Sequence, residues 1–177
     1  MKKKTLALVL ALTLLVAGVV GGTLAWLTDR TAEVKNTFTV GDINIGLTET
    51  TTDYKMVPGN TIAKDPTVTV KANSEACWLF VKVTKSENLD TFITYAIAEG
   101  WTALPGVDGV YYREVPASAA DQTFSVLADN AVTVKSDVTR TMLETAKTDA
   151  PTLTFQAYAV QKDNVASASD AWAKVNP

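Results

Sequence analysis

The run CWLFVKV, at residues 77–83, constrains the fold more than any other stretch of the chain. A half-buried strand alternates apolar and polar residues, but this run is apolar at both even and odd positions. Such a run is typical of a central strand that is covered on both faces. Trp78 and Phe80 are therefore expected to pack in the core rather than to contact a ligand. Cys77 is expected to act as a small buried hydrophobic residue.

The chain that flanks this run also reads as strands, because Thr, Val, Ile and aromatic residues alternate over short runs. In DINIGLTE, Ile43, Ile45 and Leu47 share one face, and in TVTVK the residues Val68 and Val70 point inward. Further strands are expected at 94–99, 109–115, 132–135 and 152–161.

Turn residues separate these strands. VPGN places Pro58 and Gly59 at the central positions of a type II turn, and PGVDGV forms a second turn. The apolar parity changes at Gly41, where we expect a bulge or a tight bend.

Two segments have helical rather than strand spacing. In DVTRTMLETAKTD, an apolar side follows Asp137, the expected N-cap; it consists of Val138, Met142, Leu143 and Ala146. SASDAWAKV is a short closing helix capped by Ser167 or Ser169, and Trp172 is expected to dock it. Seven or eight short strands with such helices predict a mainly β fold, a jelly-roll-like antiparallel β-sandwich with short helical insertions at 39–177.

The first 26 residues have the layout of a secretory signal peptide. MKKK is the basic region, and the 15 apolar residues LALVLALTLLVAGVV follow it. An uncleaved membrane anchor is the alternative, since about 20 apolar residues cross a bilayer. We favour cleavage close to Ala25, Trp26 and Leu27, because the apolar run is short and Gly-Gly-Thr ends it. The membrane would then hold the chain only until cleavage.

Composition narrows the possible functions of the exported part. Without residues 1–26 the chain keeps 13 basic and 19 acidic residues, a net charge of −6, which disfavours nucleic-acid binding. The sequence contains no histidine, which excludes Ser-His-Asp and Cys-His catalysis and HExxH zinc sites within the chain. With one cysteine, no intrachain disulfide can form. We therefore predict no enzyme activity, no catalytic or metal-binding residues and no cofactor.

Several motifs resemble a known family. The junction GGTLAWLTD is similar to that of exported bacterial proteins cleaved by the signal peptidase SipW. NTFTVGDINIGLTE and VPGNTIAKD resemble the TasA and camelysin family, and GVYYREV with AYAVQKDNVASASDAW resembles secreted proteins found beside its members. The resemblance implies a jelly-roll domain that assembles outside the cell into biofilm matrix fibres. In these fibres the N-terminal strand of one subunit completes the sheet of its neighbour.

Residues 27–38, LTDRTAEVKNTF, are the candidate donor strand in this chain. In an extended conformation Ala32, Val34 and Phe38 lie on one face, so the segment could add to an open sheet edge. The alternative is that it folds back onto its own domain or remains a loose tail.

The predicted function is therefore a secreted structural protein of the extracellular matrix or bacterial cell surface. It would be a fibre subunit or an accessory component, and its partner would be itself or a related matrix protein in a head-to-tail assembly. A monomeric cell-surface binding module is the first alternative. A camelysin-like metalloprotease is the second, and the lack of histidine argues against it.

Aromatic residues are the candidates for a binding module. Tyr111 and Tyr112 point to opposite faces of one strand, so at least one is expected to be exposed. Trp101 is equally compatible with packing and with a ligand contact. The Thr-rich stretch GLTETTTDYK, with Glu49 and Asp53, is expected to be a polar loop.

Overall fold

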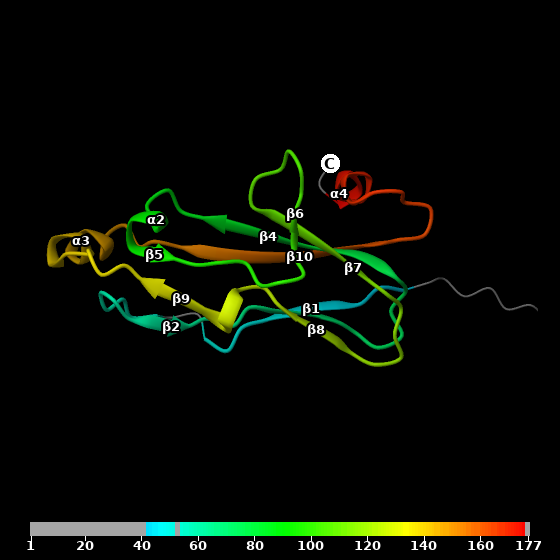
Figure 1. The fold of residues 1–177 in the computed structure, drawn as a ribbon, viewed down its shortest axis with the longest axis horizontal. Coiled ribbons are helices and arrows are strands. Elements are labelled where there is room, and N and C mark those ends of the chain that lie inside the picture. Colours follow the sequence, from blue (N-terminus) through cyan, green and yellow to red (C-terminus); the bar gives the residue numbers. More distant parts are fainter. Residues whose placement is uncertain (1–41, 52–53, 176–177) are drawn as a thin grey trace, which may run out of the picture. The chain divides into compact units, whose positions relative to one another are not determined.

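The computed structural model of this protein describes residues 42–51 and 54–175, which belong to one compact unit, Val40–Pro177 (Figure 1). The predicted signal peptide (1–26), the cleavage residues and the candidate donor strand (27–38) lie outside the described residues. The same holds for the bend expected at Gly41.

The described part of the chain is mainly β. Its strands are β1 (Ile45–Thr48), β2 (Thr61–Ala63), β3 (Thr67–Val70), β4 (Cys77–Lys85), β5 (Ile93–Thr94), β6 (Thr102–Ala103), β7 (Val110–Val115), β8 (Gln122–Ser125), β9 (Ala131–Val134) and β10 (Leu153–Gln161). Its helices are α2 (Leu89–Phe92), the 3-10 turn η1 (Ala128–Asn130), α3 (Arg140–Ala146) and α4 (Ala168–Val175).

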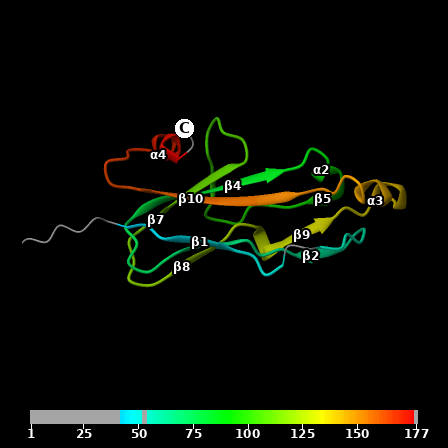
Figure 2. The same ribbon diagram turned by 180° about the vertical axis from the view of Figure 1, so that it is seen from behind.

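The strands form three antiparallel sheets, which is consistent with a β-sandwich. The largest sheet has the order β10-β4-β7-β6, the second β1-β3-β8 and the third β2-β9-β5. Figure 2 shows β10 and β4 in one layer and β1 and β8 in the layer beneath. The predicted mainly β, antiparallel fold class is thus confirmed.

The prediction for CWLFVKV is confirmed. β4 lies between β10 and β7. Cys77, Leu79 and Val81 are fully buried against β3, whose Val68 and Val70 point inward as expected.

The other face of β4 is covered by α4. Trp172 packs with its ring centroid 5.3 Å from that of Phe80 and 5.2 Å from that of Tyr158. Trp78 joins the same cluster. Ser167 accepts a hydrogen bond from the backbone N–H of Asp170 at 3.1 Å, so Ser167 is the cap. The predicted closing helix and its docking residue are confirmed.

A third apolar cluster joins α3 to the sheet β2-β9-β5. Val138 and Ala146 are buried there, with Met142 and Leu143 packed around them, as the helical spacing predicts. The expected cap was wrong: α3 begins after Thr139, whose side chain accepts from the Met142 N–H at 3.3 Å. Asp137 lies too far from the helix start because Val138 is drawn into the apolar cluster.

The turns and several strand limits follow the sequence. Gly59 has φ +81° and the N–H of Asn60 donates to the Val57 carbonyl at 3.0 Å, as a type II turn requires. The strands predicted at 109–115, 132–135 and 152–161 correspond to β7, β9 and β10.

The strand predicted at 94–99 is wrong, because regular pairing ends with β5 at Thr94 and only Ile97 forms an isolated bridge, to Leu127. The described residues form ten strands rather than seven or eight. The strands that the pattern did not indicate are the short β2, β6 and β8, of two to four residues each.

Candidate functional site

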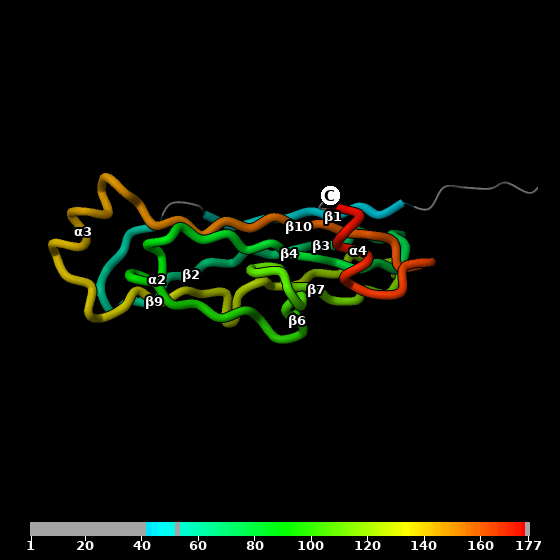
Figure 3. Tube along the Cα trace, turned by 90° about the horizontal axis from the view of Figure 1, so that it is seen from above, coloured from blue at the N-terminus to red at the C-terminus, as the bar shows by residue number. Residues whose placement is uncertain are grey.

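An open sheet edge is the feature of this fold with the clearest capacity to bind a partner. Within the described residues β10 pairs only with β4, and β1 pairs only with β3, so each ends its sheet. β1 and β10 contact each other and run along the same side of the sandwich, as Figure 3 shows. One side of the molecule therefore presents two neighbouring strands whose outer backbone groups have no strand partner among the described residues.

An apolar groove lies where these two strands approach β2. Its volume is about 680 Å³. We call it the edge groove, and its main apolar side chains are those of Leu47, Met56, Ile62, Leu153 and Phe155. Leu47 is one of two large hydrophobic residues that stay exposed among residues 42–51 and 54–175. Extended backbone beside apolar side chains is the combination that an added strand needs.

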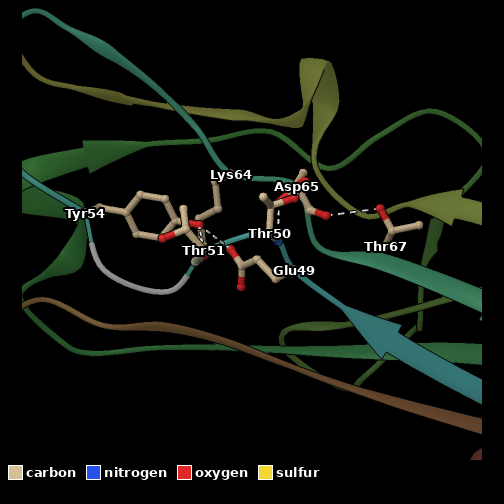
Figure 4. A network of polar contacts seen from close by, with 7 residues as sticks. All are labelled: Glu49, Thr50, Thr51, Tyr54, Lys64, Asp65 and Thr67. Atoms are coloured by element: carbon tan, nitrogen blue, oxygen red, sulfur yellow. Dashed lines mark hydrogen bonds and ion pairs between the residues drawn. The ribbon is translucent and has the colours of Figure 1, made fainter.

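A buried ion pair forms the polar end of the edge groove. The ammonium of Lys64 lies 2.6 Å from Oε1 of Glu49, and the Tyr54 hydroxyl donates to the same oxygen at 2.7 Å (Figure 4). The Lys64 Nζ also stands 4.7 Å from the ring centroid of Tyr54 and 5.3 Å from that of Phe155. Burial, followed by the hydrogen bond to Glu49, raises the pKa of Tyr54. This cluster neutralises its charges internally, so the groove favours an uncharged occupant.

A second set of contacts holds the chain after β1. Asp65 accepts hydrogen bonds from the side chain of Thr50 and from its N–H, the latter at 2.9 Å. These bonds lower the pKa of Asp65, and Thr67 donates to the Asp65 carbonyl at 3.0 Å. The segment next to the groove is thereby fixed to the start of β3.

Among residues 42–51 and 54–175, no group of three or more His, Cys, Asp or Glu side chains is placed to hold a metal ion. The ionisable side chains at the groove are already paired with one another: they are Lys64, Glu49 and Tyr54.

The described lining of the groove contains none of the sequence-predicted site residues. The cleavage residues Ala25, Trp26 and Leu27 and the donor residues Ala32, Val34 and Phe38 lie outside the described part. Trp101 packs, since its Nε1 donates to the Ser125 carbonyl at 2.8 Å.

Tyr111 and Tyr112 do occupy opposite faces of β7. Tyr111 packs against the cluster between the sheets, and Tyr112 packs against the cluster beneath α4. Both are half-buried, so the expectation that one would be exposed is wrong. The apolar clusters on both faces of this sheet extend far enough to cover each ring in part.

Sequence reasoning missed the pairing of Lys64 with Glu49, because Glu49 was assigned to a polar loop. Glu49 is in fact half-buried, while Asp53 of the same stretch lies outside the described residues. One signal for it was available in the sequence. Lys64 has an even number, as do Val68 and Val70, whose side chains point inward, and this alternation indicated an inward-pointing Lys64.

Comparisons with known proteins found no relative of this chain. No protein-family model matches the chain, and no curated protein or solved structure is significantly similar to it. None of the helices in the described part is long and apolar enough to span a membrane.

Proposed function

We propose that this chain is a secreted structural protein that assembles head to tail by donating its N-terminal segment to a neighbouring copy or a related matrix protein. It would serve as a subunit or accessory component of an extracellular biofilm matrix fibre. The proposal includes removal of residues 1–26 by a SipW-type signal peptidase and a jelly-roll connection of the strands. The open edge formed by β1 and β10, with the apolar edge groove at one end, is the observation that carries it.

The edge groove needs an occupant that is extended, apolar on one face and weakly charged on that face. In residues 27–38 the side chains of Ala32, Val34 and Phe38 share one parity, and Arg30 is the one charged residue of that parity. At about 3.3 Å per residue the segment of 12 residues spans roughly 40 Å. The nine residues of β10 span roughly 30 Å on the same basis, so the segment is long enough to pair along the whole strand.

Donation between copies produces an open assembly. The donor segment precedes β1 in the chain, whereas the acceptor is the outer edge of β1 and β10. These are different surfaces, and a heterologous contact that does not close gives a filament. Cleavage after the signal peptide would release the segment from the membrane, so export and assembly would occur in that order. Pairing of the donor segment with the edge would also cover unpaired backbone groups that otherwise promote non-specific aggregation.

The test compares two purified forms, one starting at Leu27 and one starting at Thr39, by light scattering and negative-stain microscopy. We expect filaments from the first and monomers from the second, with circular dichroism showing that both are folded. Only monomers from the Leu27 form would overturn self-assembly and favour docking of the segment on its own domain.

Matched variants locate the contact. In the Leu27 form, Val34→Asp with Phe38→Asp should abolish filaments. Thr31→Asp with Thr37→Asp adds the same charge on the opposite face and should have a much smaller effect. On the acceptor side, Leu47→Asp should stop assembly. Val57→Asp, at an exposed hydrophobic residue outside the groove, should not.

A further inference from the structure

A second pocket lies between β4, α2, β5 and β7. Its volume is about 420 Å³, and we call it the tyrosine pocket, after Tyr95 and Tyr111 in its wall. β7 pairs with β4 only as far as Lys82, opposite Val110. Lys85 therefore extends past the end of the shorter strand. The gap is bordered by Asp90 of α2 and by Lys135, which follows β9.

The polar groups of the tyrosine pocket are only partly used. Lys85 forms an ion pair with the Asp90 carboxylate, and Lys135 donates to the Asp90 carbonyl. Thr94 in the pocket wall donates to the Thr133 carbonyl at 3.4 Å, and among the described residues the hydroxyls of Tyr95 and Tyr111 have no hydrogen-bond partner. Burial raises the pKa of Tyr95, which keeps its hydroxyl protonated as a donor. Two tyrosines and two lysines thus line one opening.

The charge of this pocket is opposite to that of the chain. Two lysines and one aspartate line it, whereas the sequence as a whole has a net charge of −3. Arg113 stands two residues beyond Tyr111 on the same face of β7, outside the lining of the pocket.

Arg113 forms no ion pair among the described residues, and its Nε is buried without a hydrogen-bond partner. The guanidinium is instead held 4.0 Å from the ring centroid of Phe124 and 5.4 Å from that of Trp101. Stacking of this kind fixes a guanidinium in place without using its N–H donors.

We propose that the tyrosine pocket binds a uronate unit of an acidic polysaccharide. The ammonium groups of Lys85 and Lys135 would receive the sugar carboxylate, and the tyrosine hydroxyls and Asp90 would bond to sugar hydroxyls. The tyrosine rings offer an apolar surface to the face of the pyranose. The volume lies in the range of small-molecule sites, about 300–1,000 Å³. An extended acidic peptide fits less well, because it gains affinity from strand backbone, and the groups described here are side chains.

The test is titration calorimetry of the full chain with trigalacturonate, in a polyoxyethylene detergent that carries no sugar headgroup. We expect saturable binding of one oligosaccharide per chain. Lys135→Gln, and Tyr95→Phe combined with Tyr111→Phe, should each weaken it roughly tenfold. Lys71→Gln changes the net charge equally at a surface ion pair elsewhere, and Tyr112→Phe removes a hydroxyl from the opposite face of β7. Both should leave the affinity within about twofold.

Three results would overturn the proposal. The first is no binding of trigalacturonate at millimolar concentration. The second is equal weakening by Lys71→Gln and Lys135→Gln, which would show attraction by net charge alone. The third is equal binding of the methyl-esterified oligosaccharide or of oligoglutamate, which would indicate a neutral ligand or an acidic peptide. The pocket variants should still form filaments, so failure here and failure of strand exchange are distinguishable.

Discussion

The ammonium of Lys64 lies 2.6 Å from Oε1 of Glu49, and both side chains are largely shielded from solvent, with exposed fractions of 9% and 16%. Removing two charges from water is costly, and their mutual attraction offsets that cost only while both partners are present. The hydrogen bond from Tyr54 to the same oxygen adds to this compensation. The pair therefore makes the polar end of the edge groove sensitive to single substitutions.

Lys64→Met is expected to reduce the free energy of unfolding by about 3 kcal/mol, because it leaves the Glu49 carboxylate buried without its cation. Urea unfolding followed by tryptophan fluorescence measures the change. Lys71→Met is the control, since Lys71 pairs with Asp121 at the surface with both side chains about half exposed. It should cost less than about 1 kcal/mol. Equal costs for the two variants would contradict the assignment of a buried pair.

Trp172→Ala should destabilise the protein by about 3–5 kcal/mol, since this ring fills the space between α4 and the outer face of β4. Loss of the contacts with Phe80 and Tyr158 should also detach α4, and amide hydrogen exchange would then increase across residues 168–175. Lys174→Ala, on the exposed side of the same helix, should leave both quantities nearly unchanged.

Sequence pattern predicted the parts of this fold that depend on local periodicity. CWLFVKV indicated a doubly covered strand, and the spacing of Val138, Met142 and Ala146 indicated α3. The edge groove could not be predicted in this way. Its walls come from β1, β2 and β10, which belong to three different sheets, and more than a hundred residues separate β1 from β10 in the chain. The pairing of Lys64 with Glu49 depends instead on the pairing of β1 with β3, which alternation within one strand does not reveal.

Gly109→Ala should be strongly destabilising. Gly109 has φ +72°, and a Cβ at this position would lie 2.5 Å from the Val83 carbonyl oxygen. Gly106→Ala separates the two effects, because Gly106 has φ +75° with open space around it, and should cost about 1–2 kcal/mol from backbone strain alone. Gly46→Ala has neither problem and should be close to neutral. Thermal unfolding should rank the variants in that order.

Acid should destabilise the fold through Asp65 and Asp121. The hydrogen bond from the Thr50 side chain lowers the pKa of Asp65, and that from the Ala72 N–H lowers the pKa of Asp121, both from 3.8. A pKa lowered in the folded state contributes stability that is complete above the unfolded value, and it is lost as the pH falls through the folded value. Urea unfolding at pH 7, 4 and 2.5 should show this loss below about pH 4. Asp121→Asn should flatten the dependence, because the group whose pKa is lowered is then absent.

Cys77 should be inert in the folded protein. It is fully buried in β4, and burial raises the pKa of its thiol to about 11. The thiolate is the reactive form, so at pH 8 the thiol is both inaccessible and protonated. Labelling with iodoacetamide followed by mass spectrometry should modify the chain in 6 M guanidinium and leave it unmodified under native conditions. Rapid labelling of the native protein, or a Cys77–Cys77 dimer in a filament preparation, would show that β4 opens and would contradict its central position.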